Sequence, residues 1–392
     1  MGGEKLMNLL INPSSMNMQR YGPPPLGLLY LAAMDEETEI FDDALRPSPG
    51  FPGLEKLSPR VVGVPIYTKG RHNSLEYLRW AKERGAVTVA GGPHVAVMTK
   101  QLVEHYGDFV DHFVVGDGEL AWKAICNGED IPQVVEMRVE DLDTLPLPAW
   151  EKIDISRYPP RIKKGFGIHR NNDLPRIPRI PVILGRGCTG HCTFCSAWWV
   201  NGKLRYHGKE WMAVHLARLW ELGVRHLSFQ DDCLTTNRQA VMELCNILEG
   251  YTFSWTGVTR ADLLDTELAQ RMESAGCYML AFGIESGSQV ILDKMHKQID
   301  LSKAFVAREA CRQANIHFRA LMIRNFPYST PETNQETARF LKKLQPDDTG
   351  SVGATWVFPG TVLYQQCKRA GLIDDSFWLG DKPYYVYHGG LE

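Results

Sequence analysis

Short apolar runs alternate with stretches of helical periodicity through the first third of the chain. The runs are three to five residues long, which suits strands, and the segments between them have room for helices. This alternation predicts a doubly wound parallel sheet, in which ligands bind at the loops that follow the strands. The predicted strands are Asn8–Ile11, Glu39–Phe41, Val61–Pro65, Val87–Ala90 and His112–Val115.

A second alternation of strands and helices begins at Pro181. In its first helix Met212, Leu216 and Leu219 share one face, and Gly223 is a stop signal. Asn237 and the pair Thr330-Pro331 predict the starts of two further helices. Six strands with helices between them predict a partial (β/α)6 barrel, whose active site lies at the carboxyl ends of the strands. The predicted strands are Val182–Leu184, Arg225–Gln230, Phe253–Val258, Met279–Gly283, His317–Met322 and Val352–Val357.

The stretch between the two alternations is irregular and rich in proline, which is typical of a linker. We therefore predict a Rossmann-like domain at residues 5–130, a wrapping linker at 131–180 and a barrel at 181–350. Residues 351–392 are predicted to be a C-terminal extension that includes the last barrel strand.

Composition narrows the functional classes. The 392 residues are 44% hydrophobic and 23% charged, as in ordinary globular proteins, and the net charge of -3 gives no reason to expect nucleic-acid binding. No apolar run approaches the roughly 18 residues of a membrane helix. The first residues hold only a short apolar run before a proline-rich loop, unlike a signal peptide. We expect a cytoplasmic protein without a membrane partner.

Three of the nine cysteines lie on one loop after the first predicted barrel strand. Cys188, Cys192 and Cys195 have the spacing C-x3-C-x2-C, and glycines at 185, 187 and 190 allow the backbone to fold tightly around a bulky group. Three thiolates hold only three irons of a 4Fe-4S cube, whereas electron-transfer clusters usually take four cysteines. The spacing therefore favours a cluster with one open iron, where chemistry can take place.

Two other interpretations of this loop compete with the cluster. A structural zinc site needs four ligands, and His191 adjoins Cys192 so closely that it would strain to complete a tetrahedron. A disulfide framework fits poorly with nine cysteines spread through a long chain in a reducing compartment.

The cysteine spacing resembles the signature of the radical S-adenosylmethionine (SAM) enzymes. In that family the free iron chelates the amino and carboxylate groups of SAM, and an electron from the cluster cleaves SAM to a 5'-deoxyadenosyl radical. The resemblance implies that Cys188, Cys192 and Cys195 hold a 4Fe-4S cluster and that SAM is a second cofactor. It also implies a reductant of the flavodoxin or ferredoxin type.

Polar residues follow other barrel strands. Asp231 and Asp232 match the acidic motif with which family members hold the SAM amino group, and a helix N-cap is the competing interpretation. Arg260 matches a strand-three arginine that could pair with the SAM carboxylate. A structural salt bridge between Arg260 and Glu285 is the alternative.

The segment Ala281–Ser288 resembles the fourth-strand motif of a cobalamin-linked subgroup of the family. The resemblance implies that Glu285 and Ser286 contact SAM. Phe194, between two cysteines, is expected to cover the cluster or pack on adenine, with plain core packing as the alternative. Relatives have a glycine-rich turn after the fifth strand, and its replacement by Arg324–Pro327 is expected to reshape the adenine pocket or the substrate side.

The strand-end loops of the first domain resemble the cobalamin-binding domain of the same subgroup, although ordinary turn chemistry also explains each loop. The chain lacks the D-x-H-x-x-G loop with which some cobalamin proteins supply a histidine to cobalt. Cobalamin would therefore bind without a protein imidazole below the metal. The implied cobalamin contacts are Asn12, Ser14, Tyr67, Thr68, Gly91, Gly92, His94, Gly116 and Glu119.

Taken together, the resemblance implies a methyltransferase that acts on an unactivated carbon of a small molecule. A cobalamin-linked oxidoreductase or cyclase and a non-catalytic cobalamin or redox sensor are the alternatives. A methylthiotransferase acting on RNA would be expected to carry another cysteine trio in its N-terminal domain, whereas the first cysteine here is Cys126.

Overall fold

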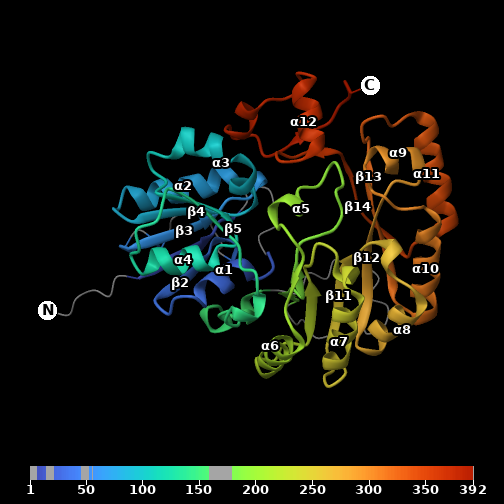
Figure 1. The fold of residues 1–392 in the computed structure, drawn as a ribbon, viewed down its shortest axis with the longest axis horizontal. Coiled ribbons are helices and arrows are strands. Elements are labelled where there is room, and N and C mark those ends of the chain that lie inside the picture. Colours follow the sequence, from blue (N-terminus) through green and yellow to red (C-terminus); the bar gives the residue numbers. More distant parts are fainter. Residues whose placement is uncertain (1–6, 15–21, 46–52, 55, 159–178, 392) are drawn as a thin grey trace. The chain divides into compact units, whose positions relative to one another are not determined.

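The chain folds into two units, each built on its own parallel sheet (Figure 1). The computed structural model describes residues 7–14, 22–45, 53–54, 56–158 and 179–391. Unit 1 comprises Met1–Tyr158 and Ile373–Tyr384, and unit 2 comprises Pro159–Leu372 and Tyr385–Glu392. The predicted extension 351–392 is therefore divided between the units, and part of the predicted linker, 159–178, lies outside the described residues.

The sheet of unit 1 has the strand order β2-β1-β3-β4-β5-β6. The five predicted strands are confirmed, with each boundary within one residue of the expectation. The sequence pattern does not predict β6, which falls in the segment we interpreted as a linker. The order reverses between β1 and β3, which makes the switch point where such sheets bind ligands. The strands are β1 (Asn8–Asn12), β2 (Thr38–Asp42), β3 (Val61–Pro65), β4 (Val87–Gly91), β5 (His112–Gly116) and β6 (Val134–Met137).

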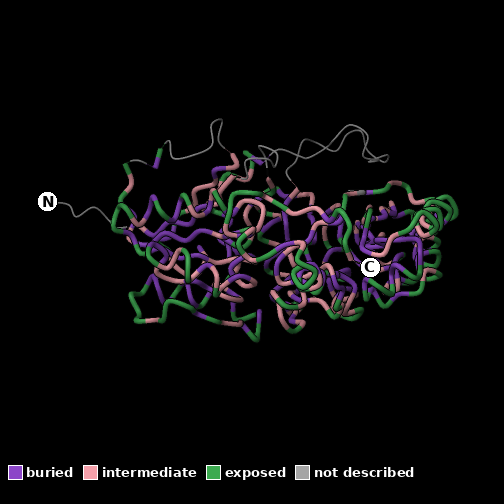
Figure 2. The backbone as a smooth tube through the Cα atoms, turned by 90° about the horizontal axis from the view of Figure 1, so that it is seen from above, coloured by how far each residue is buried: buried purple, intermediate pink, exposed green. Residues whose placement is uncertain are grey.

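Helices pack on this sheet through an apolar core. Leu10, Val61 and Val114 are buried against Trp122, whose Nε1 donates to Thr38 Oγ1 at 3.0 Å. The α-helices of unit 1 are α1 (Leu26–Ala32), α2 (Arg71–Lys82), α3 (Pro93–Tyr106) and α4 (Glu119–Cys126). Its 3-10 helices are η1 (Asp43–Leu45), η2 (Thr68–Gly70), η3 (Leu142–Thr144), η4 (Trp150–Lys152), η5 (Ile155–Arg157) and η8 (Asp375–Trp378). In Figure 2 the buried segments run through the interior and the exposed ones lie at the surface.

The C-terminal segment Ile373–Tyr384 packs on unit 1 through the buried side chain of Arg71. The guanidinium donates to the carbonyl oxygens of Phe377, Gly380 and Lys382 at 3.2, 2.6 and 2.6 Å. Arg71 thus satisfies main-chain acceptors of a segment that is remote in the sequence, which ties that segment to α2.

The sheet of unit 2 has the order β14-β13-β12-β11-β10-β7, and within the described residues it is open, because β14 and β7 are edge strands. The partial barrel is therefore confirmed. Its strands are β7 (Ile180–Val182), β10 (His226–Phe229), β11 (Ser254–Thr259), β12 (Cys277–Glu285), β13 (His317–Arg324) and β14 (Asp348–Ala354).

Two strand predictions in unit 2 are wrong in position. The first strand ends at Val182, because the chain beyond it turns into a short hairpin of β8 (Gly185–Arg186) with β9 (Arg205–Tyr206). The last parallel strand ends at Ala354 rather than Val357. β15 (Trp356–Val357) instead pairs antiparallel with β16 (Tyr385–Val386).

Two predicted helix starts in unit 2 are confirmed. Asn237 caps the next helix by accepting from the Ala240 amide at 3.2 Å, and Thr330 forms a capping box before Pro331. Figure 1 shows α7, α8, α10 and α11 following one another along the strands. The α-helices are α5 (Ala197–Val200), α6 (Lys209–Glu221), α7 (Arg238–Leu248), α8 (Thr266–Ser274), α9 (Gln289–Lys294), α10 (Ser302–Ala314), α11 (Pro331–Leu344) and α12 (Val362–Arg369). The 3-10 helices are η6 (Leu234–Thr236) and η7 (Ala261–Leu263).

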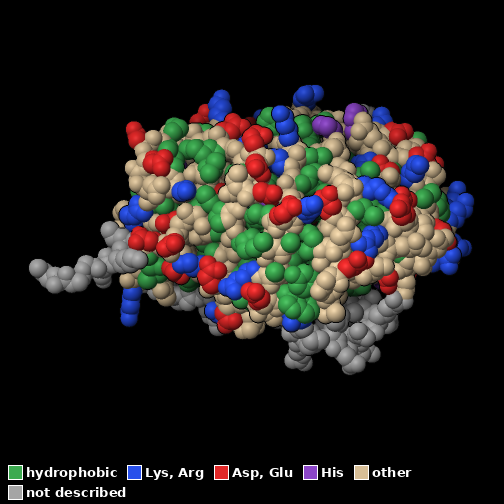
Figure 3. Space-filling view, turned by 60° about the horizontal axis from the view of Figure 1, so that its bottom comes forward, with side chains coloured by type: hydrophobic (Ala, Val, Ile, Leu, Met, Phe, Trp, Pro, Cys, Tyr) green, Lys and Arg blue, Asp and Glu red, His purple; other side chains and the backbone are tan. Residues whose placement is uncertain are grey.

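Charge is mixed on the molecular surface. On the face in Figure 3 acidic and basic side chains are interspersed, in keeping with the net charge of -3. None of the helices in the described ranges has the length and apolar character that crossing a membrane requires.

Candidate active site

The cysteine loop runs from β8 to α5, and main-chain hydrogen bonds hold its middle. The amide of Thr193 donates to the carbonyl of Met295 at 2.9 Å, and the carbonyl of Thr193 accepts from the amide of Leu363 at 2.8 Å. Thr193 is itself buried. The loop is therefore fixed between the end of α9 and the start of α12.

Two glycines have the roles that the sequence predicts. Gly187 has φ of +102°, which favours glycine, and a Cβ there would lie 2.9 Å from the carbonyl oxygen of Lys203. A Cβ added at Gly190 would lie 3.5 Å from Cys188 Sγ, 3.8 Å from Cys192 Sγ and 3.6 Å from Arg260 Nη1. The bare backbone of Gly190 thus leaves space between two thiols and a cation.

The thiols surround this space without converging on one point. Among the described residues no set of three or more His, Cys, Asp or Glu side chains is placed to hold a single metal ion. A tetrahedral zinc site would draw thiolates to about 2.3 Å from one centre. An iron-sulfur cube is several ångströms across and spreads its cysteines around it, so this donor set fits a cluster better than a single ion.

Burial raises the pKa of all three thiols, that of Cys195 to about 11. Main-chain amides oppose this effect at each of them, and two of these bonds have defined distances. The amide of Gly190 donates to Cys188 Sγ at 3.3 Å, and the amide of Ala197 donates to Cys195 Sγ at 3.4 Å. Such N–H···S bonds stabilise cluster thiolates and tune their potential.

Two cations lie near Cys192. Burial alone would lower the pKa of Lys297, but the charges of Glu285 and Cys192 outweigh it and the pKa is raised. Lys297 Nζ lies 3.1 Å from Glu285 Oε1, and Arg260 makes two bonds of 3.0 Å to Asp262. The Arg260–Glu285 salt bridge therefore does not form, since each residue has a different partner.

The two residues of the fourth-strand motif make internal contacts. Glu285 is buried and has φ of +65°, at the point where the register between β12 and β13 shifts. Ser286 Oγ accepts from the Ser288 amide at 3.1 Å and lies 3.3 Å from Thr337 Oγ1. A Cβ at Gly287 would lie 2.5 Å from Phe340 Cβ, so this turn is seated closely on α11.

The two adjacent aspartates have different environments. Asp231 is buried, and its carboxylate accepts from the amides of Leu184 and Gly185. Burial raises its pKa to about 7 although these amide bonds oppose the shift. Asp232 is exposed and accepts from Asn201 Nδ2 at 2.7 Å. The helix-cap interpretation is wrong for both, because Asn237 caps α7.

Aromatic rings lie beside the cysteine loop. The ring centroids of Phe194 and Phe326 are 6.2 Å apart in an edge-to-face arrangement. Phe326 belongs to the segment Arg324–Pro327 at the end of β13, which thus places an aromatic ring against Phe194. Trp198 Nε1 donates to the carbonyl of Cys195 at 3.1 Å.

Sequence reasoning missed Lys297 and the Phe194–Phe326 contact. Lys297 lies between His296 and Gln298, both of which have positive φ. Nothing in its sequence context indicates that this lysine is buried. The proximity of Glu285 and Lys297 is a product of the turn after α9, and only the folded chain reveals it.

In unit 1 several implied cofactor contacts bond to each other or to neighbouring acids. Asn12 Nδ2 donates to Asp42 at 2.9 Å, and Ser14 Oγ donates to Asp43 at 2.6 Å. His94 Nδ1 lies 3.2 Å from Thr68 Oγ1. Burial, with the charge of Arg71, lowers the pKa of His94 to about 3, so this histidine is neutral at physiological pH.

The remaining implied contacts of unit 1 divide into backbone and side-chain positions. Gly92 and Gly116 have φ of +93° and +95°, and a Cβ at Gly116 would lie 2.3 Å from the carbonyl oxygen of Met137. Turn chemistry therefore explains these two glycines. Gly91 is the last residue of β4. Tyr67 is 55% exposed, whereas Glu119 is buried at the start of α4.

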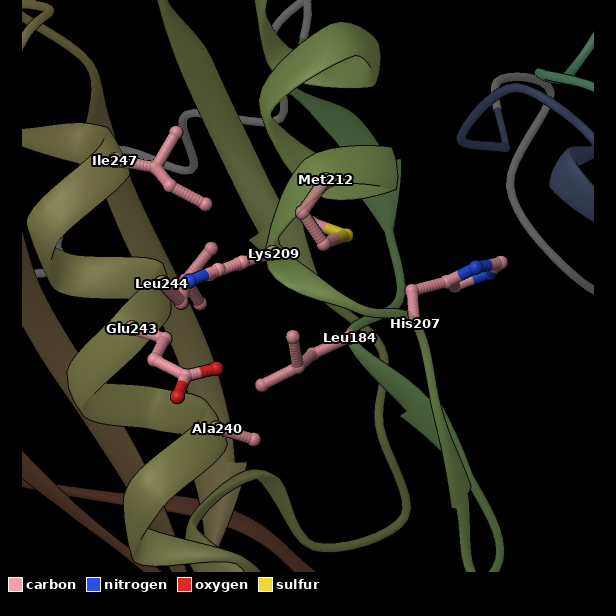
Figure 4. Close-up of a pocket in the computed structure, with 8 residues that line it drawn as sticks. All are labelled: Leu184, His207, Lys209, Met212, Ala240, Glu243, Leu244 and Ile247. Atoms are coloured by element: carbon pink, nitrogen blue, oxygen red, sulfur yellow. The ribbon is translucent and has the colours of Figure 1, made fainter. Parts of the chain in front are cut away.

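A small hollow lies away from these strand ends. Figure 4 shows it between α6 and α7, with the His207 side chain pointing away from it. Its empty volume of about 190 Å³ is below the range of typical ligand pockets, and it contains no predicted site residue. Its lining residues are Leu184, His207, Lys209, Met212, Ala240, Glu243, Leu244 and Ile247.

Comparison with known proteins agrees with the geometry of the cysteine loop. Residues 182–341 match the radical SAM superfamily. Residues 182–341 therefore form a radical SAM domain. The matched region begins at the end of β7 and includes the three cysteines, Asp231, Asp232, Arg260, Glu285 and Ser286.

Proteins similar to this chain match it over both units. An uncharacterised methyltransferase from Pyrococcus horikoshii is 28% identical, over 91% of this chain and 81% of that protein. The structure of the radical SAM methyltransferase TsrM from Kitasatospora setae, with cobalamin and a 4Fe-4S cluster bound, gives a TM-score of 0.70 at 16% identity and covers 93% of this chain and 78% of TsrM. The cobalamin-dependent SAM radical enzyme OxsB gives 0.75 at 14% identity, over 97% of this chain and 64% of OxsB. These likenesses show a shared fold.

Proposed function

We propose that the chain is a cobalamin-dependent radical SAM methyltransferase that acts on an unactivated carbon of a small molecule. The observation that carries the proposal is the set of three cysteine thiols on one loop, two of them beside Gly190, with Arg260 and Lys297 near Cys192, in a unit built on an open parallel sheet. The name of the Pyrococcus relative and the description of TsrM support methyl transfer.

Cys188, Cys192 and Cys195 would hold the 4Fe-4S cluster. When bound, the cluster and SAM together supply a 5'-deoxyadenosyl radical that can abstract a hydrogen atom from an unactivated carbon. The charges of Arg260 and Lys297 lower the pKa of Cys192, although burial raises it more, so both cations favour thiolate and anionic groups at this position.

The other residues of the motif would bind SAM itself. Asp232 is exposed and can accept a hydrogen bond from an ammonium group. Glu285 and Ser286 would border the ribose and the carboxylate of SAM. Phe194, braced by Phe326, would cover one side of the cluster or of adenine and exclude water there.

Unit 1 would hold cobalamin at the carboxyl edge of its sheet. Exposed Tyr67, with Thr68 and the glycines of the β4 and β5 ends, would form the contact surface. His94 is fully buried, which supports binding without an imidazole ligand to cobalt from this position. Asn12, Ser14 and Glu119 would support the edge; the first two do so through Asp42 and Asp43.

The radical chemistry is tested by anaerobic reconstitution of the full chain with iron and sulfide, followed by SAM and a strong reductant. Formation of 5'-deoxyadenosine is expected, and replacing any of the three cysteines with alanine should abolish it. An intact cluster that yields no 5'-deoxyadenosine would reject the proposal. Cobalamin is tested separately by its visible absorption after gel filtration.

A cobalamin-linked oxidoreductase or cyclase is the second candidate, because OxsB is described as a radical enzyme without reference to methyl transfer. SAM labelled in its methyl group separates the two. A methyltransferase forms S-adenosylhomocysteine and labelled product, whereas the second candidate forms 5'-deoxyadenosine alone. In either case a cytoplasmic flavodoxin- or ferredoxin-type protein would be the reductant.

A further inference from the structure

Asp231 holds the main chain that leads into the cysteine loop. Its Oδ1 accepts from the amide of Gly185 at 2.7 Å and from that of Leu184 at 3.1 Å, and its Oδ2 lies 3.2 Å from the Leu184 amide. The residue is 7% exposed. Both carboxylate oxygens are therefore directed at main-chain donors.

Beyond the end of β7, these bonds take the place of the hydrogen bonds that pair β7 with β10. The last β7 contact is the bond from the amide of Gln230 to the carbonyl of Val182, at 2.8 Å. Beyond it the amides of Leu184 and Gly185 are buried and need acceptors. The two oxygens of the Asp231 carboxyl group accept from these two adjacent amides, so Asp231 is suited to fix the direction in which the chain leaves the sheet.

The exit point has little room for adjustment. A Cβ at Gly185 would lie 2.6 Å from the carbonyl oxygen of Arg205, so the chain passes close to β9 there. Cys188 follows only three residues later. The position of the first cluster cysteine thus depends on where Asp231 places Gly185.

Asp232 differs from Asp231 in its exposure and in its main partner. It is exposed, and its carboxylate accepts from the side-chain amide of Asn201 at 2.7 Å, with a further interaction with the main chain of Gly187. Its charge acts on the thiols of Cys188 and Cys195, so it faces the cysteine loop. Of the two acids it is the one that a ligand can reach.

We propose that Asp231 is a positioning residue that sets the entry of the cluster loop, and that Asp232 alone of the pair contacts the SAM ammonium group. The proposal rests on the proposed function for its second half only. Its first half concerns the apo-protein and can be tested without a cluster.

The test compares Asp231→Asn with Asp232→Asn in the full chain. In the apo-proteins, alkylation of individual cysteines is followed by mass spectrometry, with buried Cys311 and Cys367 as internal controls. In Asp231→Asn, Cys188 should be alkylated about tenfold faster than in wild type, because its loop loses hydrogen bonds to the carboxyl group. The alkylation rates of Cys311 and Cys367 should not change. In Asp232→Asn the labelling of Cys188 should accelerate much less than in Asp231→Asn, and the control thiols should react at the wild-type rate. A general loss of stability would instead accelerate Cys311 and Cys367 as well.

The reconstituted proteins test the second half. Asp231→Asn should release iron to a chelator about tenfold faster than wild type, and Asp232→Asn should keep the wild-type rate but bind SAM about tenfold more weakly. Wild-type labelling of Cys188 in Asp231→Asn would overturn the positioning role. Wild-type iron release with weakened SAM binding in that variant would make Asp231 a SAM ligand instead.

Two further outcomes are distinguishable. If the wild-type chain assembles no cluster, the proposed function fails while the labelling experiment still decides the positioning role. If Asp231→Asn does not fold, Asp231→Glu keeps the charge and displaces the carboxylate by one methylene. In Asp231→Glu only Cys188 is expected to be alkylated faster. Equal acceleration of Cys188, Cys311 and Cys367 would overturn the proposal.

Discussion

Each unit contains a buried, ionisable side chain that binds main-chain groups; one is a carboxyl group and the other a guanidinium. In unit 2 Asp231 accepts from amides of Leu184 and Gly185, which lie 46 to 47 residues earlier in the chain. In unit 1 Arg71 donates to carbonyls of Phe377 and Gly380, which lie more than 300 residues later. The carboxylate arranges a local loop, whereas the guanidinium recruits a remote segment.

The chemistry of each side chain suits its task. A guanidinium presents five donors in one plane and can satisfy several carbonyls at once, and Arg71 also donates to the carbonyl of Thr68 at 2.7 Å. A carboxylate offers only acceptors in a compact group, which fits two adjacent amides. The stability of unit 1 therefore depends on a segment that is remote in the sequence. The site of unit 2 is instead held by residues at the ends of its own strands.

The largest loss of stability is expected for Arg71→Met, which removes the buried guanidinium of unit 1. The substitution leaves buried carbonyls of the C-terminal segment without their donor, so the free energy of unfolding of unit 1 should fall by about 3 kcal/mol. Urea unfolding and limited proteolysis within residues 373–384 measure the change. Arg79→Met, an exposed position on the same helix, is the control. Unchanged protease resistance of the segment would contradict the role of Arg71.

A smaller effect is expected from glycine substitutions, one in each unit. Gly287→Ala would bring a Cβ to 2.5 Å from Phe340 Cβ and should lower the stability of unit 2 by about 1 to 3 kcal/mol. Gly27 lies within α1 with no atom inside 4 Å of an added Cβ, so Gly27→Ala should stabilise unit 1 by about 0.5 to 1 kcal/mol. Melting temperatures that shift in opposite directions are expected, and a shared sign would reject this explanation.

Both units should lose stability as the pH falls, because each contains a buried histidine that stays neutral when folded. Burial lowers the pKa of His94 in unit 1 and of His215 in unit 2 to about 3. Each stays neutral when folded but takes up a proton when unfolded below about pH 6.5, so its contribution is complete above that pH and is lost as the pH falls towards 3. Between pH 7.5 and 5.5 the loss should be about 1.4 kcal/mol for each histidine.

Urea midpoints at the two pH values measure this loss, with His94→Asn and His215→Asn as the matched variants. Each substitution should reduce the pH dependence of its own unit by about this amount and leave that of the other. His226, whose pKa burial lowers to about 4, should retain a similar dependence in unit 2. A pH dependence that neither substitution reduces would assign it to other groups.

The smallest effect is expected at the surface. Arg238 pairs with Asp265 at 2.8 Å and with Glu267 at 2.5 Å, but all three side chains are well exposed. Arg238→Gln should therefore change the stability of unit 2 by less than about 1 kcal/mol, and less still in high salt. Thermal melting at low and high ionic strength measures it, and a loss comparable to that of Arg71→Met would show that burial is not what separates the two arginines.

The sequence predicts the central elements well because their signal is local. Strand β3 is predicted at its exact bounds from one apolar run, and the start of α11 from Thr330 and Pro331. The end of the last barrel strand is wrong because residues 356–357 pair with residues 385–386, a contact that no local pattern contains.

The site is predictable in its metal-binding motif but not in its supporting contacts. Asp231 and Asp232 are the same residue type in adjacent positions, and only the direction of each side chain at the end of β10 makes one buried and the other exposed. The pairing of Lys297 with Glu285 likewise follows from a turn whose positive φ values no sequence motif announces.

The recruitment of Ile373–Tyr384 to unit 1 has a consequence for synthesis of the chain. Nearly all of unit 1 leaves the ribosome first, yet Arg71 meets its carbonyl partners only after the whole of β7 to α12 has been made. Unit 1 is therefore translated first, but it can complete its fold only after residues 373–384 have been made. A premature stop between residues 373 and 377 would leave the strands of the barrel sheet complete but remove the carbonyl partners of Arg71 in unit 1.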